Sequence, residues 1–308
     1  MNLSNLLNMM PGAVANGLIW GIMAIGVYIT YRILDIADLT VDGSFATGGA
    51  VAAMLITVGK WNAYAALFAA FGAGVLAGLV TGLFHTKMGI PAILAGILTQ
   101  LALYSVNLRI MGNKSNVSVS TRNYQLVLAS MQVKKWVLDN PILILILFSA
   151  AVIALLYFFF GTEYGCALRA IGANGQMASA QGISVNRGKV VGLALSNGLV
   201  ALSGALLTQY QGTADVGQGK GAIVIGLAAV IIGEVVFGKM FRNFALKLLA
   251  VSLGSILYYL VIQVVLWLGL NTNDMKLITA VIVAVFLAVP YWKKQFGAHA
   301  RKEGKERA

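Results

Sequence analysis

The chain has 308 residues, of which 59% are hydrophobic and 10% charged, far fewer charged residues than the roughly 25% of soluble domains. This composition excludes an ordinary soluble protein. A formal net charge of +12 would favour nucleic-acid binding in a soluble chain, but here the Lys and Arg lie between long apolar segments. We therefore expect them to orient the chain in a membrane, and we expect no nucleic-acid partner.

Apolar segments of 17 to 27 residues follow one another along the whole chain, and about 20 residues cross a bilayer core. We predict an all-α polytopic membrane protein with about nine transmembrane or re-entrant helices in one domain, 1–308. The first segment has no basic stretch before it, so it is not a cleavable signal peptide. The predicted segments are 12–31, 43–59, 62–84, 91–111, 141–160, 190–211, 221–238, 244–270 and 276–292.

The distribution of basic residues predicts the orientation. The tail 293–308 holds six of the 22 Lys and Arg, which places it in the cytoplasm. With nine spans the N-terminus then lies outside, and the segment 161–189 is cytoplasmic. The external loop 112–140 also carries four basic residues, so the bias is incomplete.

The two halves of the chain resemble each other weakly. Asn16-Gly-Leu18 matches Asn197-Gly-Leu199, and Ala37-Asp-Leu39 matches Ala214-Asp-Val216. Five spans separate the corresponding elements, so the two copies have opposite orientations, and inverted repeats of this kind are typical of transporters. The second and seventh segments are both short, which marks them as candidates for a transport pathway.

Acidic residues gather before the second segment, where Asp35, Asp38 and Asp42 fall within eight residues. Asp35 is best explained as a solvated loop residue, whereas Asp38 and Asp42 lie near the repeated motif. Glu234 is the one acid well inside a segment, and it is either a gate or half of an ion pair with Lys239. We predict that the polar residues of the pathway are Asp38, Asp42, Gln100, Asn197, Asp215 and Glu234; for the two amides, hydrogen bonding between helices is an open alternative.

Glycines in the third segment form a face for close packing. Gly74, Gly78 and Gly82 follow the GxxxGxxxG spacing, which allows two helix backbones to approach each other.

A short capped helix interrupts the apolar pattern within 161–189. Asn174 is a good N-cap and Gly182 is a good residue to end a helix, which leaves about two turns between them, Gly175 to Gln181. Such a helix on a membrane face predicts a soluble docking partner.

The chain has no nucleotide, metal or catalytic site that the sequence supports. Cys166 is the only cysteine, and His85 and His299 are far apart. The stretch around Lys220 resembles a phosphate-binding loop only faintly, since Ala214 and Gly221 occupy two of its defining positions. We expect the chain to be no enzyme and to bind no cofactor; any ATP and Mg²⁺ belong to another subunit.

Two motifs resemble the permeases of ABC importers. The first runs from Thr162 to Ile183 and resembles their cytoplasmic coupling loop through Gly165, Arg169, Ala170, Gly172, Asn174, Ala178, Gly182 and Ile183. The second, Asp38-Leu-Thr-Val-Asp-Gly-Ser-Phe45 after Gly21-x-x-Ala-x-Gly26 and Tyr31-Arg32, is similar to the branched-chain amino acid and ribose class. Within that class it looks like a subgroup often assigned to tryptophan or tyrosine uptake.

This resemblance implies a subunit in a bacterial cytoplasmic membrane. Two permease copies would pair with two cytoplasmic ATPase subunits, which dock at the coupling loop. An external binding lipoprotein would deliver a small solute, for which the subgroup implies an amino acid with an aromatic ring. Arg169 would anchor the coupling loop. The alternative is a secondary transporter that couples to ions through the acids at 35–42 and Glu234.

Overall fold

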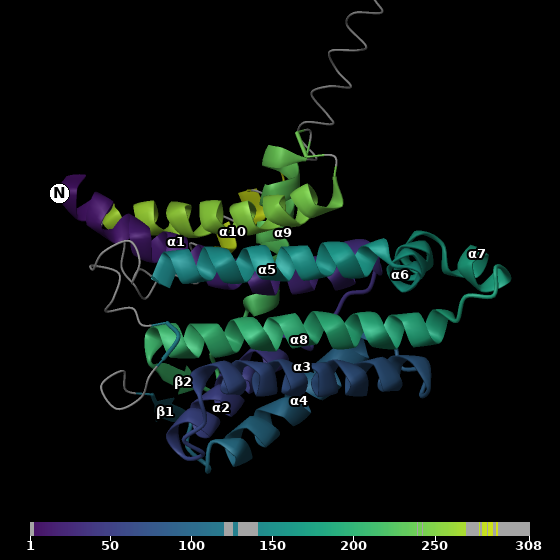
Figure 1. The fold of residues 1–308 in the computed structure, drawn as a ribbon, viewed down its shortest axis with the longest axis horizontal. Coiled ribbons are helices and arrows are strands. Elements are labelled where there is room, and N and C mark those ends of the chain that lie inside the picture. The colour runs from purple at the N-terminus through teal and green to yellow at the C-terminus, as the bar shows by residue number, and fades with distance from the viewer. Residues whose placement is uncertain are drawn as a thin grey trace, which may run out of the picture.

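The computed structural model describes residues 3–119, 126–128, 141–238, 240–241 and 243–268, with a few residues between 277 and 288. Almost all of this is helix (Figure 1). The spans are α1 (Leu3–Tyr28), α2 (Val41–Thr57), α3 (Ala63–Thr86), α4 (Ala92–Ile110), α5 (Pro141–Gly161), α8 (Val185–Gln211), α9 (Ala222–Phe237) and α10 (Phe244–Trp267). A π-helical turn, η1 (Ile29–Ile33), follows α1, and α6 (Glu163–Ala173) and α7 (Gly175–Ala180) separate α5 from α8.

Eight of the nine predicted segments are helices, with ends within about five residues of those expected, except that α1 begins at Leu3 and not at residue 12. Six helices in the described residues are long and apolar enough to cross a membrane, whereas α2 and α9 have 17 and 16 residues. The ninth predicted segment falls mostly outside the described residues, and the basic tail lies wholly outside them. The sequence does not predict the small antiparallel ribbon of β1 (Asn116–Ser118) and β2 (Thr213–Asp215).

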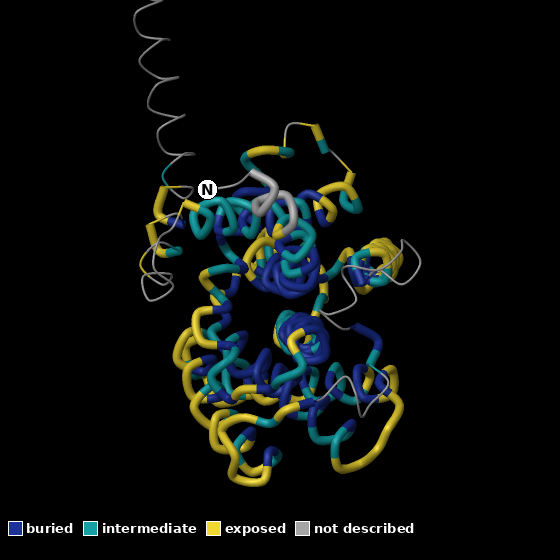
Figure 2. The backbone as a smooth tube through the Cα atoms, turned by 90° about the vertical axis from the view of Figure 1, so that its left-hand side faces the viewer, coloured by how far each residue is buried: buried dark blue, intermediate teal, exposed yellow. Residues whose placement is uncertain are grey.

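The core of the bundle is built around α8 and α1. Helix α8 packs against α1, α2 and α3, and α1 packs also against α9 and α10. Figure 2 shows the buried segments in the middle of the molecule and the exposed segments around them. In contrast, α4 and α5 lie at the periphery, and large apolar side chains such as Leu101 and Phe158 are exposed there, as expected for surfaces that face lipid or another membrane protein.

Helices α3 and α8 make the most extensive helix–helix contact in the bundle, and the glycines of α3 lie in it, as expected for a close-packing face. A Cβ atom at Gly74 would overlap the carbonyl oxygen of Asn197, and one at Gly78 would overlap the carbonyl oxygen of Leu193. The two helices run antiparallel with their backbones in contact, which is the packing that small residues allow in membranes.

Local hydrogen bonds are consistent with the predicted relation between the halves of the chain. The side-chain amide of Asn16 donates to the Gly12 carbonyl four residues earlier at 3.1 Å, and that of Asn197 donates to the Leu193 carbonyl at 3.0 Å. The two asparagines therefore make the same contact in α1 and α8.

The two aspartates of the repeat also match. Asp38 accepts a hydrogen bond from the backbone amide of Thr40 at 2.9 Å, and Asp215 accepts one from the amide of Gly217 at 2.6 Å. Each turn leads into one of the two short helices, α2 and α9. The surroundings differ, because Asp38 is buried and Asp215 is exposed.

The α3–α8 contact generates a prediction about stability. Replacing Gly78 with alanine should lower the free energy of unfolding by about 1–3 kcal/mol, since added atoms in a tight contact force the helices apart. Gly72 is the control on the same helix, because an added Cβ there meets nothing within 4 Å and alanine favours the helix. Thermal unfolding in detergent compares the variants; equal stability of the two would contradict the close contact.

Candidate functional site

Asp38 lies inside the bundle, at the centre of a buried polar cluster. Its carboxylate accepts hydrogen bonds from the Thr40 amide at 2.9 Å and from the side-chain amide of Asn197 at 2.7 Å. Asn197 in turn accepts one from the hydroxyl of Ser44 at 2.6 Å. Asn197 is near the middle of α8, so these bonds hold the non-helical segment between η1 and α2 within the bundle.

Three threonine hydroxyls extend this cluster to α3 and α4. The hydroxyls of Thr40 and Thr81 are 2.8 Å apart, and that of Thr81 donates to Thr99 at 2.9 Å. All the members are buried, with Asp38 2% exposed and Asn197 fully buried. Asp38 and Asn197, which we expected in a pathway, thus present no free surface to a solute in this conformation.

Asp42 joins the two short helices. It lies in the first turn of α2, and its carboxylate accepts hydrogen bonds from the backbone amides of Gly221 at 2.9 Å and Ile223 at 3.0 Å, at the start of α9. A carboxylate is favourable there because the first amides of a helix have no partner within it and carry a partial positive charge.

The short helices leave this junction in opposite directions. Along α2, Phe45 contacts Gly204 and Gly49 contacts Thr208, so α2 runs alongside α8 toward its C-terminal end. Helix α9 runs the other way, toward the end of the bundle that carries α6 and α7, hereafter the α6–α7 end; there its Glu234 meets Arg32. This inverted pair is what the repeat predicts.

A polar pocket of about 200 Å³ lies beside Asp42, between the start of α2, the middle of α4 and the loop before α9. Asp42 and Gln100, both predicted for a pathway, line it together. The ammonium of Lys220 lies over the ring of Tyr104, 5.8 Å from its centroid. Leu101 and Tyr104 are exposed, so this wall of the pocket is on the surface of the bundle.

Asn107 lines the same pocket, and its side chain has an unusual environment. The side chain is 1% exposed, and neither its amide nitrogen nor its oxygen has a hydrogen-bond partner among the described residues. An unpaired buried amide costs free energy, and such groups in native proteins call for an explanation such as a ligand. In the sequence, Asn107 is recognisable only as a lone amide near the end of an apolar segment. Nothing in the sequence places Lys220 at this pocket, because only the tertiary structure brings it there.

Glu234 pairs with a different partner from the one we expected. Its carboxylate lies 3.0 Å from the guanidinium of Arg32, which comes from η1. The expected partner, Lys239, was inferred from closeness in sequence and lies outside the described residues. The carboxylate of Asp215, also predicted for the pathway, accepts only from the Gly217 amide among the described residues, within its own exposed turn.

Both predicted caps of the short helix in 161–189 are confirmed. The side chain of Asn174 accepts from the Met177 amide at 3.0 Å at the start of α7. Gly182 has a φ of +79°, its amide donates to Ser179, and Ile183 donates to Ala178, which closes the helix end. The sequence analysis did not predict the preceding helix α6, which Thr162 caps by accepting from the Gly165 amide at 3.3 Å.

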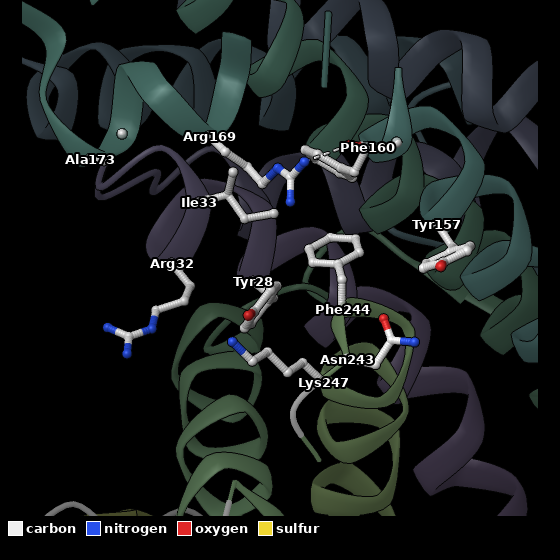
Figure 3. Close-up of a pocket in the computed structure, with 12 residues that line it drawn as sticks. Tyr28, Arg32, Ile33, Tyr157, Phe160, Arg169, Ala173, Asn243, Phe244 and Lys247 are labelled. Atoms are coloured by element: carbon white, nitrogen blue, oxygen red, sulfur yellow. Dashed lines mark hydrogen bonds between the residues drawn. The ribbon is translucent and has the colours of Figure 1, made fainter. Parts of the chain in front are cut away.

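Contacts of α6 attach the segment to the bundle. The guanidinium of Arg169 donates to the carbonyl of Phe160 at 3.0 Å, the backbone anchor that the sequence suggests (Figure 3). A Cβ at Gly165 would overlap the backbone of Phe160, and one at Gly172 would overlap the carbonyl of Ile33. Helix α6 therefore lies directly on the ends of α5 and η1.

Helix α7 extends away from the bundle at this end (Figure 1). Ala178 faces inward and is buried, whereas Met177 is 66% exposed. Of the other predicted coupling residues, Ala170 and Ile183 are half-buried. The segment thus combines a fixed base in α6 with an exposed tip in α7.

The amino-acid sequence of this chain is similar to those of known membrane permeases. The family described as branched-chain amino acid transport system / permease component matches residues 9–289. The tyrosine transport system permease protein of Clostridioides difficile (strain R20291) is 41% identical over 271 residues, 88% of each chain. The ribose import permease protein RbsC of Escherichia coli (strain K12) is 26% identical over 289 residues, 93% of this chain and 85% of RbsC.

The fold also matches a solved structure, PsaBC from Streptococcus pneumoniae in complex with Fab. The TM-score is 0.55 with 14% sequence identity, over 94% of this chain and 95% of that one. At this identity the likeness concerns the fold alone.

The Asp42 junction generates the second prediction. Replacing Asp42 with alanine should speed hydrogen exchange at the amides of Gly221 and Ile223 by about tenfold or more, since each loses a charge-assisted hydrogen bond. Exchange mass spectrometry of the purified protein measures this. Asp215→Ala is the control, because among the described residues the Asp215 carboxylate bonds only the amide of Gly217 and does not reach α9. Unchanged exchange at the start of α9 would refute the capping role of Asp42.

Proposed function

This chain belongs to the permease family of branched-chain amino acid transport systems, and from that membership we propose that it is the membrane subunit of an ATP-driven amino acid importer. The family match covers nearly the whole chain, and the relatives it matches are named as permease proteins. On this proposal the chain carries the solute across the bacterial cytoplasmic membrane and has no enzymatic activity of its own.

The α6–α7 segment is the observation that carries the proposal. Helix α7 presents an exposed, capped tip, and α6 is fixed to α5 and η1 by Gly165, Arg169 and Gly172. A force applied to α7 is transmitted to the spans because the base of the segment is rigidly packed. We propose that a cytoplasmic ATPase subunit docks on α7 and supplies the ATP, Mg²⁺ and motion.

This docking sets the orientation. The α6–α7 end is cytoplasmic, so the start of α1 lies outside, while the cytoplasmic position of the C-terminal tail rests on its basic residues alone. The opposite end, which carries the β1–β2 ribbon and the α2–α3 loop, faces the external binding lipoprotein that delivers the solute.

The pocket beside Asp42 suits an amino acid with an aromatic ring. It places a carboxylate, an ammonium and unpaired amide atoms around one space, and these match the charged amine and carboxylate of a zwitterion. Tyr104 supplies an aromatic face for a ring. A relative is named as a tyrosine transport permease, and we propose tyrosine or a similar amino acid as the solute.

A second copy of the chain completes the pathway. The pocket of about 200 Å³ is smaller than the roughly 300–1,000 Å³ of usual ligand sites, and one wall is open at Leu101 and Tyr104. A symmetric homodimer that packs near this face of α4 would close the wall and enlarge the site.

Reconstitution tests the function. The purified chain in proteoliposomes should not accumulate amino acids, whereas the chain with its ATPase and binding protein should take up tyrosine only with ATP. A second candidate, the ion-coupled transporter, predicts uptake by the chain alone under a proton or sodium gradient. Such uptake would refute the importer proposal. Measuring the accumulation of labelled tyrosine decides between them.

A variant in the same assay tests the coupling segment. Gly182→Pro should abolish uptake while the ATPase still hydrolyses ATP, because proline cannot adopt a φ of +79° and lacks the amide that donates to Ser179. Gly161→Ala is the control, since an added Cβ there meets nothing within 4 Å. Normal uptake per ATP in Gly182→Pro would exclude a role of the α7 end in coupling.

A substitution at Asn107 tests the pocket. Asn107→Leu should stabilise the fold by about 1–3 kcal/mol, because it removes an unpaired buried amide, and should reduce kcat/KM for uptake by roughly ten- to hundredfold. Thermal unfolding and initial uptake rates measure the two effects. The control is Ser149→Ala, another buried polar group without a partner among the described residues, on α5. If Asn107→Leu retains full uptake, the pocket does not contact the solute.

A further inference from the structure

A larger cavity of about 690 Å³ lies at the α6–α7 end of the bundle, apart from the pocket beside Asp42 (Figure 3). Its walls come from the ends of α1 and η1, the end of α5, helix α6 and the start of α10. From this lining the proposed function uses Arg169 and Gly172, and both only to fix α6 to the bundle.

Packing contacts hold the walls of the cavity in place. Gly172 brings α6 against the carbonyl of Ile33, so the π-helical turn and α6 form one continuous wall. The ring of Phe160 lies 5.1 Å from that of Phe244, which joins the end of α5 to the start of α10. The cavity is therefore a built feature of the bundle end.

Three cationic side chains line the cavity, and no carboxylate of the described residues lines it. Arg32 is paired with Glu234, which lies outside the lining. Among the described residues, Arg169 makes hydrogen bonds through only one of its nitrogens, which donates to Phe160 and to the sulfur of Cys166. Lys247 is exposed, and its ammonium has no ion pair or hydrogen bond with a described residue. Within the described part of the chain, the charges of Arg169 and Lys247 thus have no counter-charge.

Four aromatic side chains also line the cavity, which continues into an apolar surface. Tyr28, Tyr157 and the two packed phenylalanines form the walls between the cations. Tyr157 is 49% exposed, and next to it on α5 Phe158 is 78% exposed and Leu155 69% exposed. A ligand in this cavity therefore meets cations at one part and a membrane-facing apolar surface at another.

We propose that this cavity binds the headgroup of an anionic phospholipid. The phosphate is held by Arg169 and Lys247, since guanidinium and ammonium groups donate charge-assisted hydrogen bonds to phosphate oxygens. The glycerol lies against the tyrosines, and the acyl chains follow the exposed face of α5. Basic pockets between membrane helices are suited to such lipids. The bound lipid links α5, α6 and α10 at the base of the α6–α7 segment.

Lipid binding to the purified full-length chain tests this proposal. Native mass spectrometry should show that phosphatidylglycerol binds more tightly than phosphatidylcholine with the same acyl chains. Lys247→Gln should weaken phosphatidylglycerol binding by about fivefold, the effect of one lysine near an anionic headgroup, and should leave phosphatidylcholine binding unchanged. Lys87→Gln is the matched control, because Lys87 is exposed at the C-terminus of α3 outside this cavity, and it should have no effect.

Three results would overturn the proposal. Equal loss of binding in Lys247→Gln and Lys87→Gln would mean that the lipid responds only to overall charge. Competition by glycerol 3-phosphate at equal affinity would assign the cavity to a soluble phosphate compound. Loss of ATPase co-purification in Lys247→Gln, with lipid binding unchanged, would assign it to a carboxylate of the protein partner. The assay needs no transport, so it is independent of the proposed function.

Discussion

The hydrogen bond between the Asp38 carboxylate and the Asn197 side chain is the interaction on which the arrangement of this protein depends. It holds the non-helical segment after η1 inside the bundle, where backbone polar groups need partners within the protein. Because this segment ends within the bundle, α2 begins there too. The start of α2 in turn brings Asp42 to the start of α9.

The two short helices, α2 and α9, bring polar groups together at the centre of the molecule. Their N-termini meet at Asp42, and the polar pocket lies beside this meeting point, with Lys220 and the unpaired Asn107 around it. The paired Asp38 fixes the backbone, whereas Asn107, one of several buried polar groups without a partner among the described residues, lies at the pocket. A packed bundle can therefore be rigid and still have polar atoms available at a pocket.

A short path of packed residues joins the pocket region to the α6–α7 end. Gly172 of α6 lies on the Ile33 carbonyl, and the chain continues from Ile33 to Asp38 in only five residues. Displacement of α6 therefore acts directly on the segment that positions α2. The basic cavity lies on the same contact between α6 and η1, so a lipid bound there would stiffen this connection.

The sequence alone was enough to predict the long apolar helices and the two caps of α7, because these depend on apolar runs about as long as a bilayer is thick and on local hydrogen bonds of Asn174 and Gly182. It also predicted a close-packing glycine face on α3, since glycine spacing is read along one helix, but not that α8 is the partner. The partners of charged and polar groups needed the tertiary structure. Glu234 bonds Arg32 from a distant element, and Lys220 reaches Tyr104 across the fold. Such partners are chosen by how helices pack in space, and closeness along the chain carries no information about that choice.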